Sequence, residues 1–589
     1  MPEFAVGEWN LKELVKDPKS PGFTRQLQNI ETKVRKFEKN KNHLNPNIST
    51  SRFLKTLNEL EDISKTVSIA IGYASLLYSA NTQSDEATSL LSKMTKLGSE
   101  IENRTLFFDQ WWKKHLDQKN ATRLTKSAGE LSEYLRHKRL IAKYSLTEPE
   151  ERIINTLDVT GSTALVKLYD KITNSFQFVV KTEGKKKKYT REQLTLLVRH
   201  HKPKIREIAY QSLFTEYEKN KGVLGEIYQN LVLNWKNECL EIRKYASPIS
   251  VRNIGNDVDD KTVNSLLSVC KNNSKVFQKY FSHKASMLGM KKLRRYDIYA
   301  PVVTKIKQRK YTFDQAVKLV LKTLNEFSPK LSEHAKKVFV QKHVDSSIRI
   351  GKRSGAFCST IAPEITPYVL VNFNGRSNDV FTLAHELGHA IHSESASDKS
   401  IFVQEAPLPL AETASTFSEM LLFDEILQRV SDEEKKSILA EHIDDLYSTV
   451  MRQAFFTSFE ISVHKKIGDG ATVEEITQMY TKNLHEQFSN TITIPEAFGI
   501  EWSCIPHFYH SPFYCYAYSF GNLLALSFFQ RYKNEGRSFV PNYLEILAAG
   551  GSKKPESLLE EHGIDITSQK FWQDGFRYIE NQVERLGKI

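Results

Sequence analysis

Cysteine is scarce in this sequence, which holds five in 589 residues. No two of them form a Cys-x-x-Cys pair, and their number is odd. A disulfide framework is therefore not expected, and buried free thiols in a reducing compartment are the better interpretation. The cysteines are Cys239, Cys270, Cys358, Cys504 and Cys515.

Long apolar runs are also missing. The longest, at 368–373 and 523–529, are far shorter than the roughly 20 residues that a membrane-spanning helix needs. The first residues contain neither a basic segment nor an apolar one, so no secretory signal is visible. We therefore expect a cytoplasmic protein that does not associate with a membrane.

The charge excess is modest for a chain of this length. The sequence has 83 basic and 70 acidic side chains, which leaves a net charge of +13. Its 40% hydrophobic and 26% charged residues are ordinary for a soluble globular protein, and its length predicts at least two subdomains. Four consecutive lysines at 185–188 are best interpreted as the solvated tip of a hairpin. No basic patch or motif predicts nucleic-acid binding.

What the sequence does contain is the motif His385-Glu386-x-x-His389. Residues four apart lie on the same face of an α-helix, so both imidazoles can reach one metal ion. Glu386 can then act on a third ligand of that ion as a general base. The apolar residues of 380–392 fall on the opposite side of this predicted helix. The alternative is a solvated polar face that holds two histidines by chance.

Gly388 lies beside the imidazoles on the same predicted helix. A glycine inside a helix costs about 1 kcal/mol relative to alanine. Its presence therefore predicts that another segment of the chain approaches the helix closely at this point.

A third metal ligand is predicted at Glu412. The metzincin pattern is excluded, because it needs Gly and His where this sequence has His392 and Ser395. A second amphipathic helix is predicted from Ala411 to Phe423, with carboxylates on one side and packing residues on the other. Two histidines and Glu412 would leave the fourth position of a zinc ion open for water, which is typical of catalytic sites.

Other residues near the motif compete for these roles. Glu405 is a less well placed alternative to Glu412, since it precedes the prolines that open the second helix. His392 can ligate the metal, donate a hydrogen bond to a ligand or simply face the cleft. Glu419, two turns after Glu412, is a candidate for holding a ligand imidazole in the required tautomer.

The segments 385–392 and 411–419 resemble the oligoendopeptidase F group of the thimet oligopeptidase family, and the similarity extends over nearly the whole chain. The resemblance implies one Zn²⁺ per chain, bound by His385, His389 and Glu412, with Glu386 as the catalytic base. It also implies a helical, zincin-like metallopeptidase in which an N-terminal helical subdomain covers a deep channel. Short peptides would be the substrates, because such a channel excludes folded proteins.

Periodic apolar positions predict a mainly α fold. We predict an N-terminal helical subdomain at 1–195 and a catalytic domain at 196–589. Two short β-type runs at 355–359 and 368–373 predict a small sheet beside the motif helix. The edge of such a sheet can bind an extended peptide through main-chain hydrogen bonds, which predicts a broad sequence preference.

An aromatic-rich stretch at 501–518 follows the predicted helices. Similarity to the family implies that His507 and Tyr514 contact the substrate carbonyl, where a hydrogen-bond donor stabilises the developing oxyanion. Other residues in the stretch compete for these two roles. They are Tyr509, His510, Tyr516 and Tyr518.

The sequence therefore predicts a zinc-dependent oligoendopeptidase. A zinc-dependent carboxypeptidase or dipeptidyl carboxypeptidase is a rival interpretation, because it would use the same metal ligands and differ only in what blocks the cleft. A helical binding protein with an accidental motif is a more distant rival. No feature of the sequence indicates an oligomeric state.

Overall fold

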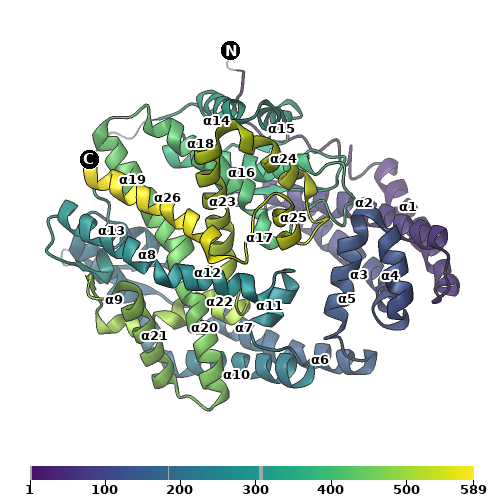
Figure 1. Ribbon diagram of the computed structural model, residues 1–589, viewed down its shortest axis with the longest axis horizontal. Coiled ribbons are helices and arrows are strands. Elements are labelled where there is room, and N and C mark those ends of the chain that lie inside the picture. Colours follow the sequence, from purple (N-terminus) through teal and green to yellow (C-terminus); the bar gives the residue numbers. More distant parts are fainter. Residues whose placement is uncertain (1–2, 183–184, 304–309) are drawn as a thin grey trace. The chain divides into compact units, whose positions relative to one another are not determined.

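A computed structural model describes residues 3–182, 185–303 and 310–589 (Figure 1). The chain forms two compact units that alternate along the sequence. The first comprises Met1–Lys143, Lys307–Gln428 and Arg531–Ile564, and the second comprises Tyr144–Ile306, Arg429–Gln530 and Asp565–Ile589. These units do not coincide with the predicted division at 195, which stays a prediction about domains.

Helices make up most of the first unit, and the prediction of a mainly α fold is confirmed. Many of them begin at a serine, threonine or aspartate whose side chain accepts a backbone N–H of the first turn, as Ser49 does for Arg52. Their bounds are α1 (Pro21–Glu38), α2 (Thr50–Ala80), α3 (Asp85–Gln110), α4 (Gln118–Ser127), α5 (Ser132–Ala142), α14 (Phe313–Phe327), α15 (Pro329–Val340), α16 (Ser377–Ser395), α17 (Leu408–Ala411), α18 (Thr413–Leu427), α24 (Phe539–Ala549) and α25 (Pro555–Glu561).

A small sheet of three strands accompanies these helices, as predicted. Its order is β4 (Val344–Asp345), β6 (Tyr368–Leu370) and β5 (Phe357–Ser359), with β6 parallel to β4 and antiparallel to β5. The sequence analysis did not anticipate β4, because two residues give no periodic signal. Strand β6 is fully buried, whereas β5 lies at the edge of the sheet and is half-buried. Both strands contact α16.

The second unit is also helical. Its antiparallel hairpin of β1 (Phe178–Thr182) and β2 (Lys185–Tyr189) confirms the predicted hairpin, but the four lysines at 185–188 form strand β2 and are not the tip, as had been predicted. Residues 183 and 184 lie outside the described residues. A second pair, β3 (Leu293–Arg294) and β7 (Ile492–Thr493), is parallel. The helices are α6 (Glu148–Thr160), α7 (Ser162–Asn174), α8 (Arg191–Val198), α9 (Pro203–Lys219), α10 (Lys221–Trp235), α11 (Ser250–Gly255), α12 (Asp260–Asn272), α13 (Ser274–Met287), α19 (Asp432–Leu446), α20 (Arg452–Gly468), α21 (Val473–Phe488), α22 (Pro506–His510), α23 (Tyr516–Glu535, in this unit up to Gln530) and α26 (Gln569–Lys588).

The cysteines and the apolar helices bear on the first two predictions made from the sequence. All five cysteines are free; four are buried and Cys358 is half-buried. Among the described residues, no helix is both long and apolar enough to cross a membrane.

Helices α16 and α18 lie against each other in the first unit (Figure 1). Their closest approach is at Gly388, which confirms the prediction made from that glycine. A Cβ atom at this position would lie 2.4 Å from Ser415 Cα and 2.5 Å from the Ala414 carbonyl oxygen. Since both neighbours are backbone atoms, only a shift of one helix could make room. The absence of a side chain at residue 388 therefore sets the spacing of the two helices.

We predict that a Gly388→Ala substitution destabilises the protein by about 1–3 kcal/mol, the usual cost of an overpacked core. This cost arises although alanine is intrinsically the better helix former by about 1 kcal/mol. The midpoint of denaturant unfolding measures the effect.

Gly222→Ala is the matched control, because Gly222 lies in an exposed turn of α10 and its added Cβ would meet nothing within 4 Å. That variant should be as stable as the wild type or slightly more stable. Equal stability of the two variants would contradict the close approach at Gly388.

Candidate metal centre

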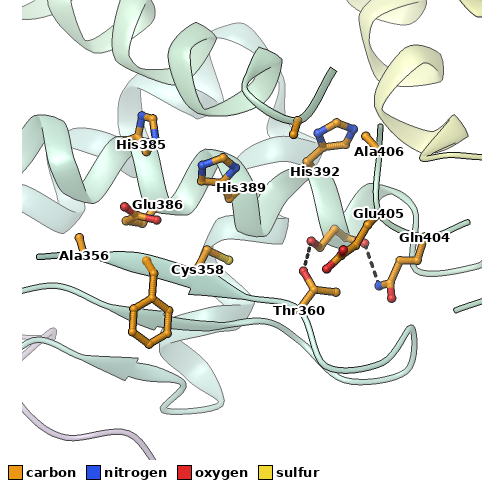
Figure 2. Close-up of a pocket in the computed structure, with 13 residues that line it drawn as sticks. Ala356, Cys358, Thr360, His385, Glu386, His389, His392, Gln404, Glu405 and Ala406 are labelled. Carbon is orange, nitrogen blue, oxygen red and sulfur yellow. Dashed lines mark hydrogen bonds between the residues drawn. The ribbon is translucent and has the colours of Figure 1, made fainter. Parts of the chain in front are cut away.

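Helix α16 carries the two imidazoles and the carboxylate of the motif. Its first turn is held by Asp379, whose Oδ2 accepts the backbone N–H groups of Asn374 (2.8 Å) and Arg376 (2.9 Å). His385 and His389 lie one turn apart on the helix, as Figure 2 shows. Their ring centroids are 4.9 Å apart, with the rings edge to face. The predicted motif helix is therefore confirmed.

Glu412 occupies the junction between α17 and α18. The prediction of one helix running on from Ala411 is wrong here, because α17 ends at Ala411 and Glu412 is the residue before α18. The Thr413 hydroxyl donates to the Leu410 carbonyl (2.5 Å) and stabilises this break. The Ser415 hydroxyl donates to Glu412 Oε2 at 2.8 Å, which orients the carboxylate. This role of Ser415 was not predicted. Its position three residues after Glu412, in the first turn of a helix, could have indicated a hydrogen bond between the two side chains.

The three predicted ligand side chains converge. Glu412 Oε2 lies 3.5 Å from His385 Nε2 and 3.5 Å from His389 Nε2. One ligand atom from each residue lies within 4.8 Å of the others. A tetrahedral zinc ion with bonds of about 2.0–2.2 Å holds its ligand atoms roughly 3.3–3.6 Å apart. Two imidazoles and a carboxylate at these separations therefore fit such an ion.

Glu419 contacts the other ring nitrogen of His385. The distance from His385 Nδ1 to Glu419 Oε1 is 2.5 Å. A carboxylate at this nitrogen favours the tautomer with the proton on Nδ1, which leaves the Nε2 lone pair directed toward Glu412 and His389. The structure thus places Glu419 where the sequence analysis proposed it, beside a ligand imidazole.

The electrostatic environment of the two imidazoles differs. Burial lowers the pKa of His385, but the hydrogen bond to Glu419 and the charges of Glu419 and Glu412 outweigh it and raise the pKa to about 9. Burial and the neighbouring His385 lower the pKa of His389, and the Glu412 carboxylate opposes this shift. The carboxylates of Glu412 and Glu419 thus stabilise positive charge at the two imidazoles, although burial outweighs this effect at His389.

Glu386 is buried, with 7% of its surface exposed. Burial and the negative charges of Glu412 and Glu419 together raise the pKa of its carboxyl group to about 7, against the opposing effects of His385 and the Cys358 backbone. A carboxyl group that titrates near neutral pH can both take up and release a proton, as a general base must.

His385, Glu386 and His389 line a cavity of about 440 Å³. Its opposite wall is strand β5, shown below α16 in Figure 2, with Ala356 at one end and Thr360 at the other. Because β5 is an edge strand, one side of its backbone is not paired within the sheet. The remaining lining residues are Phe357, Cys358, His392, Ser393, Gln404, Glu405, Ala406 and Ala411.

The two alternative ligands from the sequence analysis also line this cavity. His392 is buried, and burial together with His389 lowers its pKa to about 4. Neither His392 nor Glu405 belongs to the group of converging ligand atoms, which within the described chain consists of His385, His389 and Glu412.

His507 and Tyr514 belong to the second unit and are not among the residues that line this cavity. There they form a cluster of three rings with Tyr518. The rings of His507 and Tyr514 are parallel at 5.7 Å, and Tyr518 Oη lies 3.3 Å from His507 Nε2. All three side chains are half-buried. Burial, together with the neighbouring His510 and Arg452, lowers the pKa of His507, which favours the neutral imidazole.

The other candidates in this stretch have different surroundings. Tyr509 is buried and stacks on Tyr169 at 3.8 Å. Tyr516 is buried and accepts a hydrogen bond from Asn256 Nδ2 at 2.8 Å. His510 Nε2 lies 2.8 Å from the Asp170 carboxylate. Tyr509 and Tyr516 are therefore packing residues of the second unit, whereas the roles of His507 and Tyr514 stay predictions.

Known proteins with similar sequences cover nearly the whole chain. An oligoendopeptidase F homolog of Borreliella burgdorferi is 29% identical and aligns over 99% of this chain and 98% of its own length. The chromosomal oligoendopeptidase F of Lactococcus lactis subsp. cremoris is 26% identical, over 96% of this chain and 94% of its own. These matches confirm the resemblance stated from the sequence.

Solved structures share the fold. A crystal structure from Chlamydophila abortus superposes with a TM-score of 0.87 at 26% identity, and 98% of each chain is covered. That of oligoendopeptidase-F from Enterococcus faecium gives a TM-score of 0.70 at 20% identity, over 96% of this chain and 98% of its own.

The family model of peptidase family M3 matches residues 196–578. This segment contains the α16 motif, Glu412 and the 501–518 stretch. The protein is therefore a peptidase and belongs to peptidase family M3.

Proposed function

We propose that this protein is a zinc-dependent oligoendopeptidase that hydrolyses internal peptide bonds of short, unfolded peptides. The observation that carries the proposal is the convergence of ligand atoms from His385, His389 and Glu412 within 4.8 Å, beside the buried carboxyl group of Glu386. The names of its relatives, oligoendopeptidase F and its homologs, support the class of substrate.

Zinc is the metal that this donor set favours. Imidazole nitrogens with one carboxylate suit Zn²⁺ better than Mg²⁺ or Ca²⁺, which prefer oxygen ligands. A zinc ion bound there would lower the pKa of a coordinated water to near 7 and polarise the substrate carbonyl. The three protein ligands leave a fourth position free for that water or the carbonyl oxygen.

Glu386 is the general base of the proposed reaction. It takes the proton of the attacking water while the water oxygen forms a bond to the peptide carbonyl carbon. It then delivers this proton to the amide nitrogen as the carbon–nitrogen bond breaks. Its raised pKa supports the second step, because a carboxyl group that titrates near neutrality holds the proton long enough to donate it.

Strand β5 provides the proposed binding edge for the peptide. Residues of this strand line the cavity that contains Glu386, and one side of the strand is unpaired in the sheet. Hydrogen bonds between the main chains of β5 and an extended peptide would hold the scissile bond without selecting side chains. In the second unit, His507 and Tyr514 are the proposed donors to the oxyanion, a role supported by their shared ring cluster and half-buried position.

The Glu386→Gln variant should retain zinc and lose most of its peptidase activity. A general base typically contributes about 10²–10⁴-fold to the rate, and glutamine cannot accept the proton. Zinc content, measured by atomic absorption after dialysis, and kcat on a quenched fluorescent peptide are the two readouts.

Glu412→Gln provides the contrast, because it removes a ligand rather than the base. It should lower the affinity for zinc by more than the roughly 10–100-fold that loss of an outer hydrogen-bond partner costs. Normal turnover by Glu386→Gln, or unchanged zinc affinity of Glu412→Gln, would be incompatible with these assignments.

The Tyr514→Phe variant should lose about 10²–10³-fold in kcat with little change in KM, the usual effect of removing one oxyanion donor. Steady-state kinetics on the same peptide measure it. Tyr245→Phe, at a half-buried tyrosine of the same unit, is the control and should keep the wild-type rate. An unchanged kcat in Tyr514→Phe would remove that residue from the mechanism.

Cleavage-site mapping distinguishes the proposed endopeptidase from the carboxypeptidase and dipeptidyl carboxypeptidase alternatives. We expect the enzyme to cleave an internal bond of a peptide of about ten residues whether or not its C-terminus is amidated, since binding to an edge strand needs no free carboxylate. Mass spectrometry identifies the fragments. Cleavage confined to peptides with a free C-terminus, with release of one or two residues, would favour the exopeptidase.

A further inference from the structure

Glu405 lines the same cavity as His385, Glu386 and His389, but its carboxylate has no part in the proposed reaction. Figure 2 shows it at the Thr360 end of the cavity, with His385 and Ala356 at the other end. Burial raises the pKa of the Cys358 thiol, and the charges of Glu386 and Glu405 add to this shift. Glu405 therefore lies within electrostatic range of the centre of the cavity.

The Glu405 carboxylate is not neutralised by the protein. Its side chain is exposed to the cavity, and within the described residues it forms neither an ion pair nor a side-chain hydrogen bond. Partial loss of hydration raises the pKa of this carboxyl group, and no neighbouring charge opposes the shift. A cationic group entering the cavity would meet an acceptor that no other residue occupies.

The main chain fixes the position of Glu405. The N–H of Gly551 donates to the Val403 carbonyl at 2.7 Å. A Cβ atom at Gly551 would lie 2.7 Å from the Glu405 carbonyl oxygen, and one at Gly550 would lie 2.6 Å from that of Gln404. The turn containing these two glycines thus presses directly on the backbone of 403–405. Because the backbone is held, binding a ligand to the carboxylate orders only the Glu405 side chain and not the loop that carries it.

Further polar groups surround this end of the cavity. The hydroxyls of Thr360 and Ser393 lie 2.5 Å apart, and Gln404 Nε2 donates to the Ser393 carbonyl at 3.4 Å (Figure 2). Hydroxyl oxygens can accept additional hydrogen bonds from an ammonium or guanidinium group that pairs with Glu405.

We propose that Glu405 forms a subsite for a cationic group of the bound peptide, either a lysine or arginine side chain or the free α-amino group. The subsite sets a preference for positive charge, and it rests on the proposed peptidase function. We take the bound peptide to pair antiparallel to β5, as β6 does on the other side of the strand, so that it runs from Thr360 toward Ala356. In this orientation Glu405 recognises positive charge on the N-terminal side of the cleaved bond.

The test is a series of peptides that differ at one position at a time. Each carries lysine, its uncharged analogue norleucine, or glutamate at successive positions on the N-terminal side of the cleaved bond. The wild-type enzyme should prefer lysine over norleucine at one position by about 10-fold or more in kcat/KM, the usual effect of a hydrogen bond to a charged group. The Glu405→Gln variant should lose this preference and keep its rate on the norleucine peptide.

A second arm distinguishes the two sources of positive charge. Peptides with neutral side chains are compared with and without N-terminal acetylation. If the α-amino group is the ligand, acetylation lowers kcat/KM of the wild type and leaves Glu405→Gln unaffected. If a side chain is the ligand, acetylation has no effect and the lysine preference remains.

Two further variants sharpen the outcome. Glu405→Lys should reverse the selectivity and favour glutamate at the same position. Glu333→Gln, which removes a carboxylate from an exposed site on α15 away from the cavity, should retain the wild-type preference.

Equal cleavage of the lysine and norleucine peptides together with no effect of acetylation would overturn the subsite alone, and so would a preference that persists in Glu405→Gln. A preference confined to the C-terminal side of the cleaved bond would overturn it as well. Failure to cleave any peptide in the series by zinc-loaded enzyme would instead overturn the proposed function, and the subsite with it.

Discussion

The close approach of α16 and α18 at Gly388 is the constraint on which the candidate site depends. Each helix alone carries only part of the chemistry: α16 has the two imidazoles and Glu386, while Glu412 and Glu419 come from the start and middle of α18. Only when the two backbones meet do both carboxylates reach the imidazoles, one at Nε2 and the other at Nδ1 of His385. The helix–helix contact thus sets the distances between the predicted ligand atoms.

The same contact concentrates negative charge. Glu386, Glu412 and Glu419 lie around two imidazoles in partly buried surroundings, and the pKa of Glu386 rises to about 7 as a result of burial and of its acidic neighbours. The pKa of His385 rises to about 9, because a positive charge there offsets the carboxylates. Such an arrangement is unfavourable for an empty polar cavity and favourable for a bound dication, which would compensate the charge at the point where the three ligand atoms converge. The electrostatics and the geometry therefore support the same ligand.

Much of this site was predictable from local sequence patterns. The four-residue spacing of His385 and His389 requires only helical periodicity, and Gly388 correctly signalled a close neighbour because glycine inside a helix has a cost that packing must justify. The break before Glu412 was missed, because it depends on a hydrogen bond between Thr413 and Leu410 that periodicity does not reveal. Strand β4 was missed because its two residues are defined by pairing with β6, which is distant in sequence.

His507 and Tyr514 were located by family resemblance, since a stretch rich in aromatic residues fits a core as well as a site. The structure distinguishes Tyr509 and Tyr516 from these two residues, because both tyrosines are buried.

Binding along β5 and binding at Glu405 would make different contributions to selectivity. Main-chain hydrogen bonds to an edge strand are the same for almost every residue, so they give affinity without discrimination. A single carboxylate on a held backbone discriminates by charge and adds little for neutral peptides, because a carboxylate without a partner keeps much of its hydration. The two together describe an enzyme that accepts many sequences and favours those with a positive group at one place. The Gly550–Gly551 turn is essential to this arrangement, since a mobile loop would lose in conformational entropy what the charge interaction gains.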